Sequence, residues 1–95
     1  MNRIYEVVTV LSPALGEEGL AATSAKIRAL IESAATIESV EEWGRKRLAY
    51  EVQDQHEGYY TLTTFSAAPE FPKELERVLK ITEGVLRFLV IRKGE

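Results

Sequence analysis

Hydrophobic and polar positions along the chain follow two different periods, and the changes from one period to the other divide it into six elements. Segments rich in β-branched and aromatic residues are expected strands. Segments in which apolar residues recur every three or four positions are expected helices. The expected strands are 3–11, 36–52, 59–65 and 85–92, and the expected helices lie between Gly16 and Ala34 and between Pro72 and Gly84.

Each expected helix has its own boundary residues and one apolar face. The first begins at Gly16 as N-cap, and the glutamates that follow place negative charge where the helix dipole favours it. The second begins near Pro72, which suits a first helical turn, and ends at Gly84. The residues expected on the inner faces are Leu20, Ile27, Leu30, Ile31 and Ala34 in the first helix, and Leu75, Val78, Leu79 and Thr82 in the second.

The strand patterns differ, and the differences predict where each strand lies. The nearly continuous apolar run in 7–11 suits a central strand better than an edge strand. Alternation in 36–52 fails at Gly44, which predicts a bulge or a bend there. The polar residues 54–58 predict the turn of a long hairpin that continues into 59–65.

The element order β-α-β-β-α-β is that of the ferredoxin-like, split β-α-β plan. Right-handed crossovers would place both helices on one face of a four-stranded antiparallel sheet and leave the other face open. Ninety-five residues, without an internal repeat or a low-complexity linker, predict a single α+β domain spanning 1–95.

Composition narrows the possible functions. The chain has no cysteine, which excludes a disulfide framework and thiolate chemistry. Its start lacks the apolar core of a signal peptide, and no apolar run approaches the roughly 20 residues of a membrane span. We therefore expect a cytoplasmic protein. The net charge of −3 means that RNA binding would need a local basic patch and a partner that shares the electrostatic work.

No pattern in the sequence indicates catalysis, a cofactor or a metal site. The single histidine, His56, lies among carboxylates in the expected polar turn, where a solvated side chain is the simpler interpretation. The six glycines form no phosphate-binding motif. The loop 12–16 lacks the arginine with which some ferredoxin-like domains hydrolyse acyl phosphates. We expect a protein that is not an enzyme.

The densest positive charge follows Gly44, where Arg45, Lys46 and Arg47 are framed by Trp43 and Tyr50. Because strand side chains alternate, the two arginines should share a face that the lysine does not. Such charge on both sides of a strand predicts an edge position. Guanidinium groups and aromatic faces suit phosphates and unstacked bases. The alternative is that the cations only protect a sheet edge from aggregation.

Several segments together resemble the bacterial small-subunit ribosomal protein six family, in the same order and spacing and over essentially the whole chain. The second expected strand carries the basic run followed by Leu-Ala-Tyr. The matching segments are Trp-Gly-Arg-Lys-Arg-Leu-Ala-Tyr at 43–50, Tyr-Glu-Val-Val-Thr-Val-Leu-Ser-Pro at 5–13, Gly-Tyr-Tyr at 58–60 and Gly-Val-Leu-Arg-Phe-Leu-Val-Ile-Arg at 84–92.

The resemblance implies a structural component of the small (30S) ribosomal subunit. Members of the family pair with the eighteenth small-subunit protein, which is strongly basic, and the two bind the central domain of the small-subunit (16S) rRNA. The sequence departs from the family pattern in two places. Many members have proline at the position of Glu51, and many continue after the last strand beyond the position of Glu95. By position, the implied RNA and partner surface contains Trp43, Arg45, Lys46, Arg47 and Tyr50, with Arg3, Arg87, Arg92 and Lys93 as weaker candidates at strand ends.

Two other classes share the element order. An RNA-recognition motif would stack bases on aromatic residues of its first and third strands. Here Glu57, Thr61 and Thr64 stand at positions where that motif has basic or stacking residues, so Tyr59 and Tyr60 are expected to pack within the fold. The third class is a regulatory or self-associating ferredoxin-like domain that pairs edge to edge and does not contact RNA.

Overall fold

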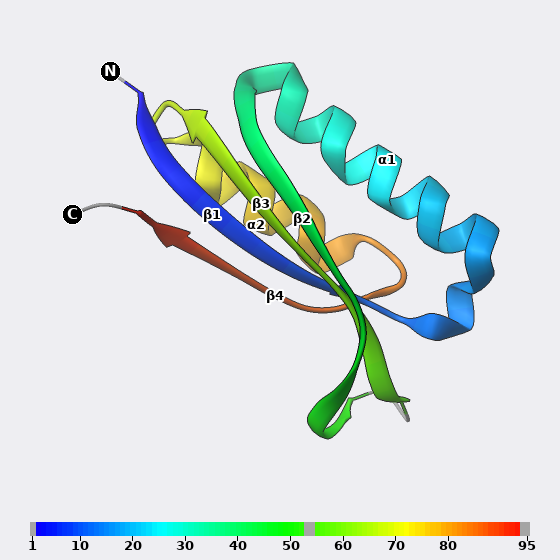
Figure 1. The fold of residues 1–95 in the computed structure, drawn as a ribbon. Coiled ribbons are helices and arrows are strands. Elements are labelled where there is room, and N and C mark those ends of the chain that lie inside the picture. Colours follow the sequence, from blue (N-terminus) through cyan, green and yellow to red (C-terminus); the bar gives the residue numbers. More distant parts are fainter. Residues whose placement is uncertain (1, 53–54, 94–95) are drawn as a thin grey trace.

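Both helices lie on one face of an antiparallel sheet, and the chain passes back and forth between the two layers (Figure 1). The computed structural model describes residues 2–52 and 55–93, and within them it has four strands, two α-helices and one short 3-10 helix. In chain order these are β1 (Arg3–Leu11), η1 (Pro13–Leu15), α1 (Gly16–Ala34), β2 (Ala35–Val52), β3 (Gln55–Ala67), α2 (Phe71–Ile81) and β4 (Val85–Arg92).

The strand order in the sheet is β2-β3-β1-β4, with antiparallel pairing between all neighbours. This arrangement confirms the ferredoxin-like fold and the central position of β1. The strands β2 and β4 form the two edges. An edge strand keeps one row of backbone N–H and C=O groups without a neighbouring strand in the sheet, so β2 and β4 are where another molecule can pair with this one.

The main hydrophobic core lies between the sheet and the two helices. The Phe65 ring, at its centre, stacks on Tyr5 with 5.7 Å between ring centroids and meets the edge of Phe71 at 5.9 Å. Each such side chain contributes about 1.5–3 kcal/mol of transfer free energy when fully buried. The largest fully buried side chains are Phe65, Leu11, Ile31, Leu75, Leu79 and Val7.

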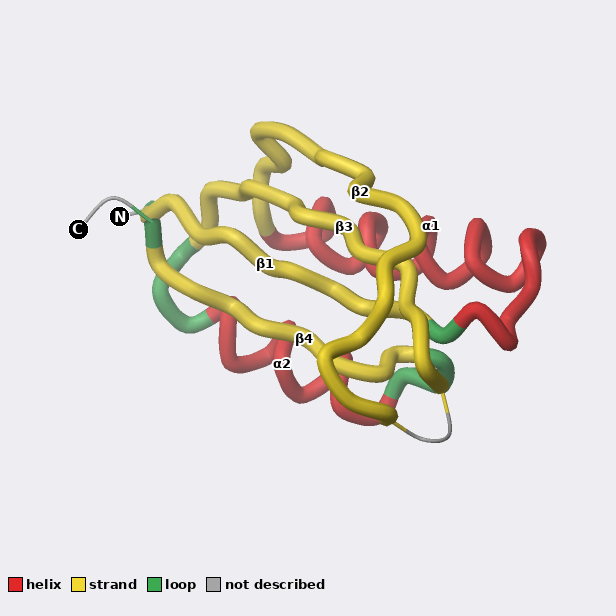
Figure 2. The backbone as a smooth tube through the Cα atoms, turned by 60° about the horizontal axis from the view of Figure 1, so that its bottom comes forward, coloured by secondary structure: helices red, strands yellow, loops and turns green. Residues whose placement is uncertain are grey.

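A second, smaller core lies on the face of the sheet away from the helices. The strands β2 and β3 both continue past the end of β1, and this extension, residues 45–52 and 55–58, is here called the hairpin arm. The arm folds back over the open face (Figure 2), where Leu48 packs against Val10 of β1 and Leu86 of β4. These three side chains are buried, so the expectation of a wholly open face is only partly correct.

Gly58 allows the arm to approach the sheet this closely. A Cβ atom at this position would lie 2.3 Å from Cγ1 of Val10 and 3.5 Å from Cδ2 of Leu48. The first distance is too short for two carbon atoms that are not bonded to each other, so a side chain here would push the arm away from β1. Glycine is thus required at the point where β3 passes beyond the end of β1.

The predicted turn at 54–58 is wrong in its extent. Residues 55–58 belong to β3, where Gly58 pairs with Lys46 and Glu57 pairs with Arg47. Residue 54 lies outside the described residues. Backbone pairing with the long β2 strand holds these polar residues extended, because a strand that is solvated on one side needs no apolar pattern there.

Three smaller expectations about the helices are corrected. Ala34 is exposed, because α1 ends there and the chain turns directly into β2. Thr82 follows α2 as its C-cap and does not belong to the inner face. Gly16 is the first residue of α1 rather than its N-cap, and its φ of 76° closes the preceding 3-10 turn.

Candidate nucleic-acid interface

The basic run lies on the edge strand β2, directly after a bulge. Gly44 has a φ of 81° and the pairing register between β2 and β3 shifts between Glu42 and Gly44, as the broken alternation predicts. A positive φ is rarely adopted by residues with a Cβ atom, so glycine suits this position. Trp43, at the bulge, is 43% exposed and stacks on Tyr60 with 6.5 Å between ring centroids.

Arg45 and Lys46 each lie over an aromatic ring, on opposite faces of the hairpin. The guanidinium of Arg45 is 5.6 Å from the centroid of the Tyr59 ring and 3.5 Å from a carboxylate oxygen of Glu57. The ammonium of Lys46 is 5.8 Å from the centroid of the Trp43 ring. The side chain of Arg45 is still 53% exposed, so the cation is oriented by the ring and accessible to an incoming phosphate.

Tyr50 and Arg87 meet across the sheet, although 37 positions separate them in the sequence. The guanidinium of Arg87, on β4, lies 5.0 Å from the centroid of the Tyr50 ring, and its Nη1 donates a hydrogen bond to the Tyr50 hydroxyl. Tyr50 is 58% exposed. The arm therefore brings Tyr50 into contact with Arg87, which the sequence placed among the weaker candidates.

The other three candidates, Arg3, Arg92 and Lys93, lie near the two described ends of the chain. These ends are side by side at the opposite end of the sheet from the arm (Figure 1). Lys93 is 3.7 Å from a carboxylate oxygen of Glu6, and its backbone N–H donates to the carbonyl of Ile4. The structure thus divides the nine predicted residues into two groups. Six of them gather on or beside the arm: Trp43, Arg45, Lys46, Arg47, Tyr50 and Arg87.

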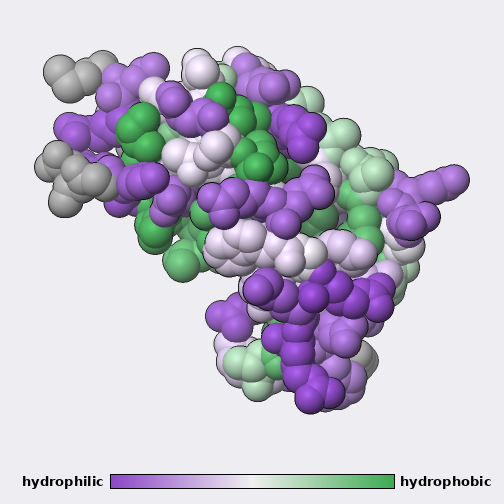
Figure 3. Space-filling model, viewed as in Figure 1, coloured by the Kyte–Doolittle hydropathy of each residue, from purple (hydrophilic) through white to green (hydrophobic). Residues whose placement is uncertain are grey.

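The surface of the arm is strongly hydrophilic. In Figure 3 it forms the lower lobe of the molecule, where hydrophilic residues predominate, whereas apolar side chains show on the sheet above it. Cations held beside exposed aromatic rings can contact phosphates and stack on unpaired bases.

Among residues 2–52 and 55–93, no group of three or more His, Cys, Asp or Glu residues is placed to hold a metal ion.

Tyr59 and Tyr60 pack inside the fold, as the sequence predicts. Tyr59 packs against the main core on the helix side, and Tyr60 packs against the smaller core on the opposite side. Neither ring is free on the open face as a stacking platform of the RNA-recognition type requires.

The described helices include none that is long and apolar enough to cross a bilayer.

The described ionisable groups include one clearly perturbed pair, and it lies away from the arm. Arg77, on α2, donates two hydrogen bonds to Glu74, one turn earlier, and these bonds lower the pKa of the Glu74 carboxyl. Both side chains are exposed. This pair is a local helix contact and contributes nothing to the candidate interface.

The fold and this surface define a small ferredoxin-like protein with a cationic, aromatic arm on a sheet edge. Comparison with known proteins identifies the family, because the model of the family described as ribosomal protein S6 matches residues 4–92. The chain belongs to the ribosomal protein S6 family.

Individual relatives agree with this assignment. The small ribosomal subunit protein bS6 of Clostridium novyi is 49% identical over 90 residues, covering 94% of this chain and 95% of that protein. The bS6 protein of Clostridium botulinum strain Langeland is 50% identical over 90 residues, covering 94% and 96%. Among solved structures, 30S ribosomal protein S6 from Thermotoga maritima superimposes with a TM-score of 0.91 at 28% identity, covering 98% of this chain and 89% of that one.

The fold alone would not have given the family. The C-terminal domain of the MgtC protein from Mycobacterium tuberculosis superimposes with a TM-score of 0.61 at only 18% identity, which shows a shared architecture and nothing more. Membership of the S6 family confirms the resemblance seen in the sequence, together with a structural role, the absence of enzymatic function and a cytoplasmic location.

Proposed function

We propose that this protein is a structural constituent of the small (30S) ribosomal subunit. In this role it binds the central domain of 16S rRNA as a heterodimer with the eighteenth small-subunit protein. The names of its relatives support a place in the small subunit. The RNA domain and the protein partner go beyond those names and rest on the family resemblance and on the surface of this molecule.

The hairpin arm carries the proposal. It places Arg45, Lys46 and Arg47 on an edge strand, with an exposed tryptophan before them and an exposed tyrosine after them. The smaller core around Leu48 packs the arm against the sheet, so the backbone that carries these cations has a defined position before RNA binds. A preorganised surface loses less conformational entropy on binding than a flexible one.

The overall charge explains why a partner is needed. The chain has 12 basic and 15 acidic residues, so its net charge opposes binding to RNA. The arm concentrates three of the cations within three consecutive positions. A basic partner would supply the further phosphate contacts that most RNA-binding proteins obtain from their own net positive charge.

Reconstitution tests the proposal directly. We expect the purified chain to bind a 16S central-domain transcript at least tenfold more tightly when the eighteenth protein is present than alone, in a filter-binding titration. Tagged protein expressed in cells should co-sediment with small subunits in a sucrose gradient. Micromolar binding of the lone chain to short single-stranded oligonucleotides, with no gain from the partner, would favour the RNA-recognition class instead.

A further inference from the structure

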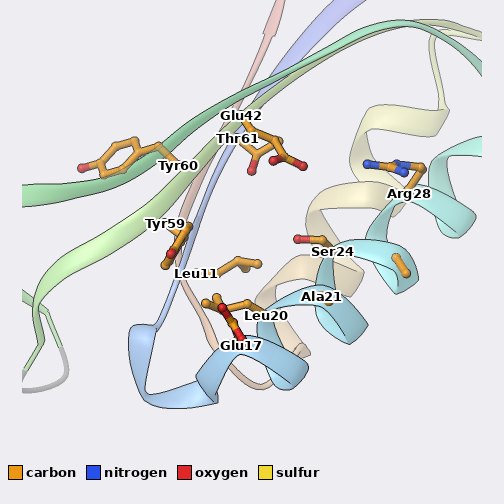
Figure 4. Close-up of a pocket in the computed structure, with 12 residues that line it drawn as sticks. Leu11, Glu17, Leu20, Ala21, Ser24, Arg28, Glu42, Tyr59, Tyr60 and Thr61 are labelled. Atoms are coloured by element: carbon orange, nitrogen blue, oxygen red, sulfur yellow. The ribbon is translucent and has the colours of Figure 1, made fainter.

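A groove of about 400 Å³ lies between α1 and the part of the sheet formed by β2 and β3. The side chains of Leu11 and Leu20 and the ring of Tyr59 make its surface mainly apolar (Figure 4). Binding sites for small organic groups are of this kind, because apolar walls enclose the ligand and a few polar groups fix its orientation. The size and the walls of this groove suit a flat ring such as a nucleobase.

A donor and an acceptor meet at one end of the groove. Arg28, on α1, and Glu42, on β2, both line it, and their side chains point toward each other across it (Figure 4). Both residues are exposed, so a ligand can reach them from solvent. A guanidinium only donates hydrogen bonds and an ionised carboxylate only accepts them, so this end can bind a ring that has both kinds of group.

The bulge at Gly44 brings a cation of the arm to the same face of the hairpin as Glu42. In a regular strand, residues 42 and 45 would point to opposite faces, because side chains alternate. Here Glu42 pairs with Thr61, and Arg45 pairs with the tyrosine two positions earlier on β3. Residues two apart on a strand share a face, so the bulge turns Arg45 to the side of α1. Arg45 lies over the Tyr59 ring and thus next to the groove.

The charges around the groove are mixed, and a nucleotide uses both signs. Glu17 and Glu42 are negative, whereas Arg28 and Arg45 are positive. A phosphate binds to a guanidinium, and the N–H groups of a base bind to a carboxylate. The groove is also continuous with the basic run of the arm, because the Tyr59 ring borders both.

We propose that this groove binds one unpaired guanine nucleotide of the rRNA, with its base beside the Tyr59 ring and its phosphate at Arg45. On the Watson–Crick edge of guanine, the ring N–H and the amino group are neighbouring donors, and one carboxylate can accept from both. In each of the other three bases an acceptor lies beside the donor, and Glu42 would repel it. The guanine oxygen can accept from Arg28. The inference rests on the proposed function and adds the recognition of one base to it.

Mononucleotides test the groove without RNA. Titration of isotope-labelled protein with 5′-GMP, followed by NMR, should shift the amide signals of residues that line the groove. We expect AMP, CMP and UMP to bind at least about fivefold more weakly, because a bidentate contact to a base edge discriminates by about this factor or more. Shifts that are confined to the arm and that inorganic phosphate reproduces would mean that only phosphate binds, and would overturn the inference.

Glu42→Gln tests the contact with the base and keeps the size of the side chain. The amide group replaces one acceptor by a donor, which would face the donors of guanine, so the preference for GMP over AMP should fall below about twofold. Glu38→Gln makes the same change on the same strand, at an exposed position that does not line the groove, and should keep the preference. An unchanged preference in Glu42→Gln would overturn the inference.

Ala21→Trp fills the groove and tests the source of the nucleotide. Ala22→Trp places the same side chain on the same helix, at an exposed position that does not line the groove. In filter binding of the heterodimer to the 16S central-domain transcript, we expect a loss of at least about fivefold for Ala21→Trp, because a stacked base contributes about this factor or more. Ala22→Trp should change the affinity less than about twofold.

The outcomes separate this inference from the proposed function. If the wild-type heterodimer does not bind the transcript, the proposed function is wrong and the inference fails with it. If it binds and Ala21→Trp binds equally tightly, only the groove assignment fails. GMP binding that Ala21→Trp abolishes, together with an unchanged RNA affinity, would assign the groove to a free nucleotide and would also overturn the inference.

Discussion

The two halves of strand β2, on either side of Gly44, differ in charge and in surroundings. The first half carries Glu38, Glu41 and Glu42, stays within the sheet and runs beside α1. The second half carries the three consecutive cations, leaves the sheet where β1 ends and folds over the opposite face. One edge strand thus carries acidic residues in its first half and basic residues in its second half.

This contrast explains how an acidic protein can contribute to RNA binding. The net charge of −3 is a sum over the whole chain and hides the local charge of the two halves of β2, which are separated by a single glycine bulge. The acidic and basic residues of β2 lie in separate segments of the strand, so the arm forms a local basic patch in a chain that is acidic as a whole.

Detaching the arm should have the largest effect. Leu48→Ala removes a side chain that is 7% exposed and anchors the arm to Val10 and Leu86. We expect a loss of about 2–4 kcal/mol in the free energy of unfolding, measured by urea denaturation. RNA binding by the heterodimer should weaken, because the cations are no longer held in place, whereas binding to the partner protein alone should stay within twofold.

Leu89→Ala is the matched control for this prediction. Leu89, on β4, is 58% exposed, so the same truncation should change the unfolding free energy by less than about 1 kcal/mol. If folded Leu48→Ala protein binds RNA as tightly as the wild type, the position of the arm does not matter for RNA binding. The division of β2 into two functional halves would then lose its physical basis.

The fold could be predicted from the sequence because each element had a local pattern of its own. Apolar periodicity located both helices, and Gly44 marked the bulge. The long apolar run in β1 placed that strand at the centre, since a strand covered by neighbours on both edges has the least access to water. The extent of β3 was missed, because residues 55–58 have a turn-like composition and are held extended only by pairing with β2.

The site was predictable only in part, for a related reason. The basic run is contiguous in sequence and could be recognised there, but the folding of the arm over the open face depends on long-range contacts. Leu48 meets Val10 and Leu86, and Tyr50 meets Arg87, across the sheet. The glycine at position 58 was the one local signal in the sequence that could have indicated the close approach of the arm to β1. The groove beside α1 left no sequence pattern, because its lining residues come from α1, β1, β2 and β3 and meet only in the folded chain.

Removing charge from the arm should have an intermediate effect, confined to RNA. We expect Arg45→Ala with Arg47→Ala to lower the RNA affinity of the heterodimer by about 10–100-fold, or roughly 1.4–2.7 kcal/mol. The salt dependence of binding should also become shallower, because fewer counterions are released. The thermal midpoint should change little, since an exposed ion pair such as Arg45 with Glu57 contributes about 0–1 kcal/mol.

Lys73→Ala with Lys80→Ala provides the control for net charge, because it removes two exposed cations from α2 instead. Its RNA affinity should fall by less than about threefold if the location of the charge matters. Equal losses in the two double variants would mean that RNA responds to total charge alone. A large drop in the thermal midpoint of the arm variant would instead assign Arg45 and Arg47 a structural role.

The smallest effect should come from the contact that closes the arm over β4. Tyr50→Phe removes the hydroxyl that accepts a hydrogen bond from Arg87 but keeps the ring over which the guanidinium lies. At this exposure the bond contributes about 0.5–1 kcal/mol, and we expect faster hydrogen exchange confined to the arm amides. A double-mutant cycle with Arg87→Ala isolates the pair. A coupling energy of zero would leave Leu48 and its cluster as the sole anchor of the arm, and the basic half of β2 would then be more mobile than the acidic half.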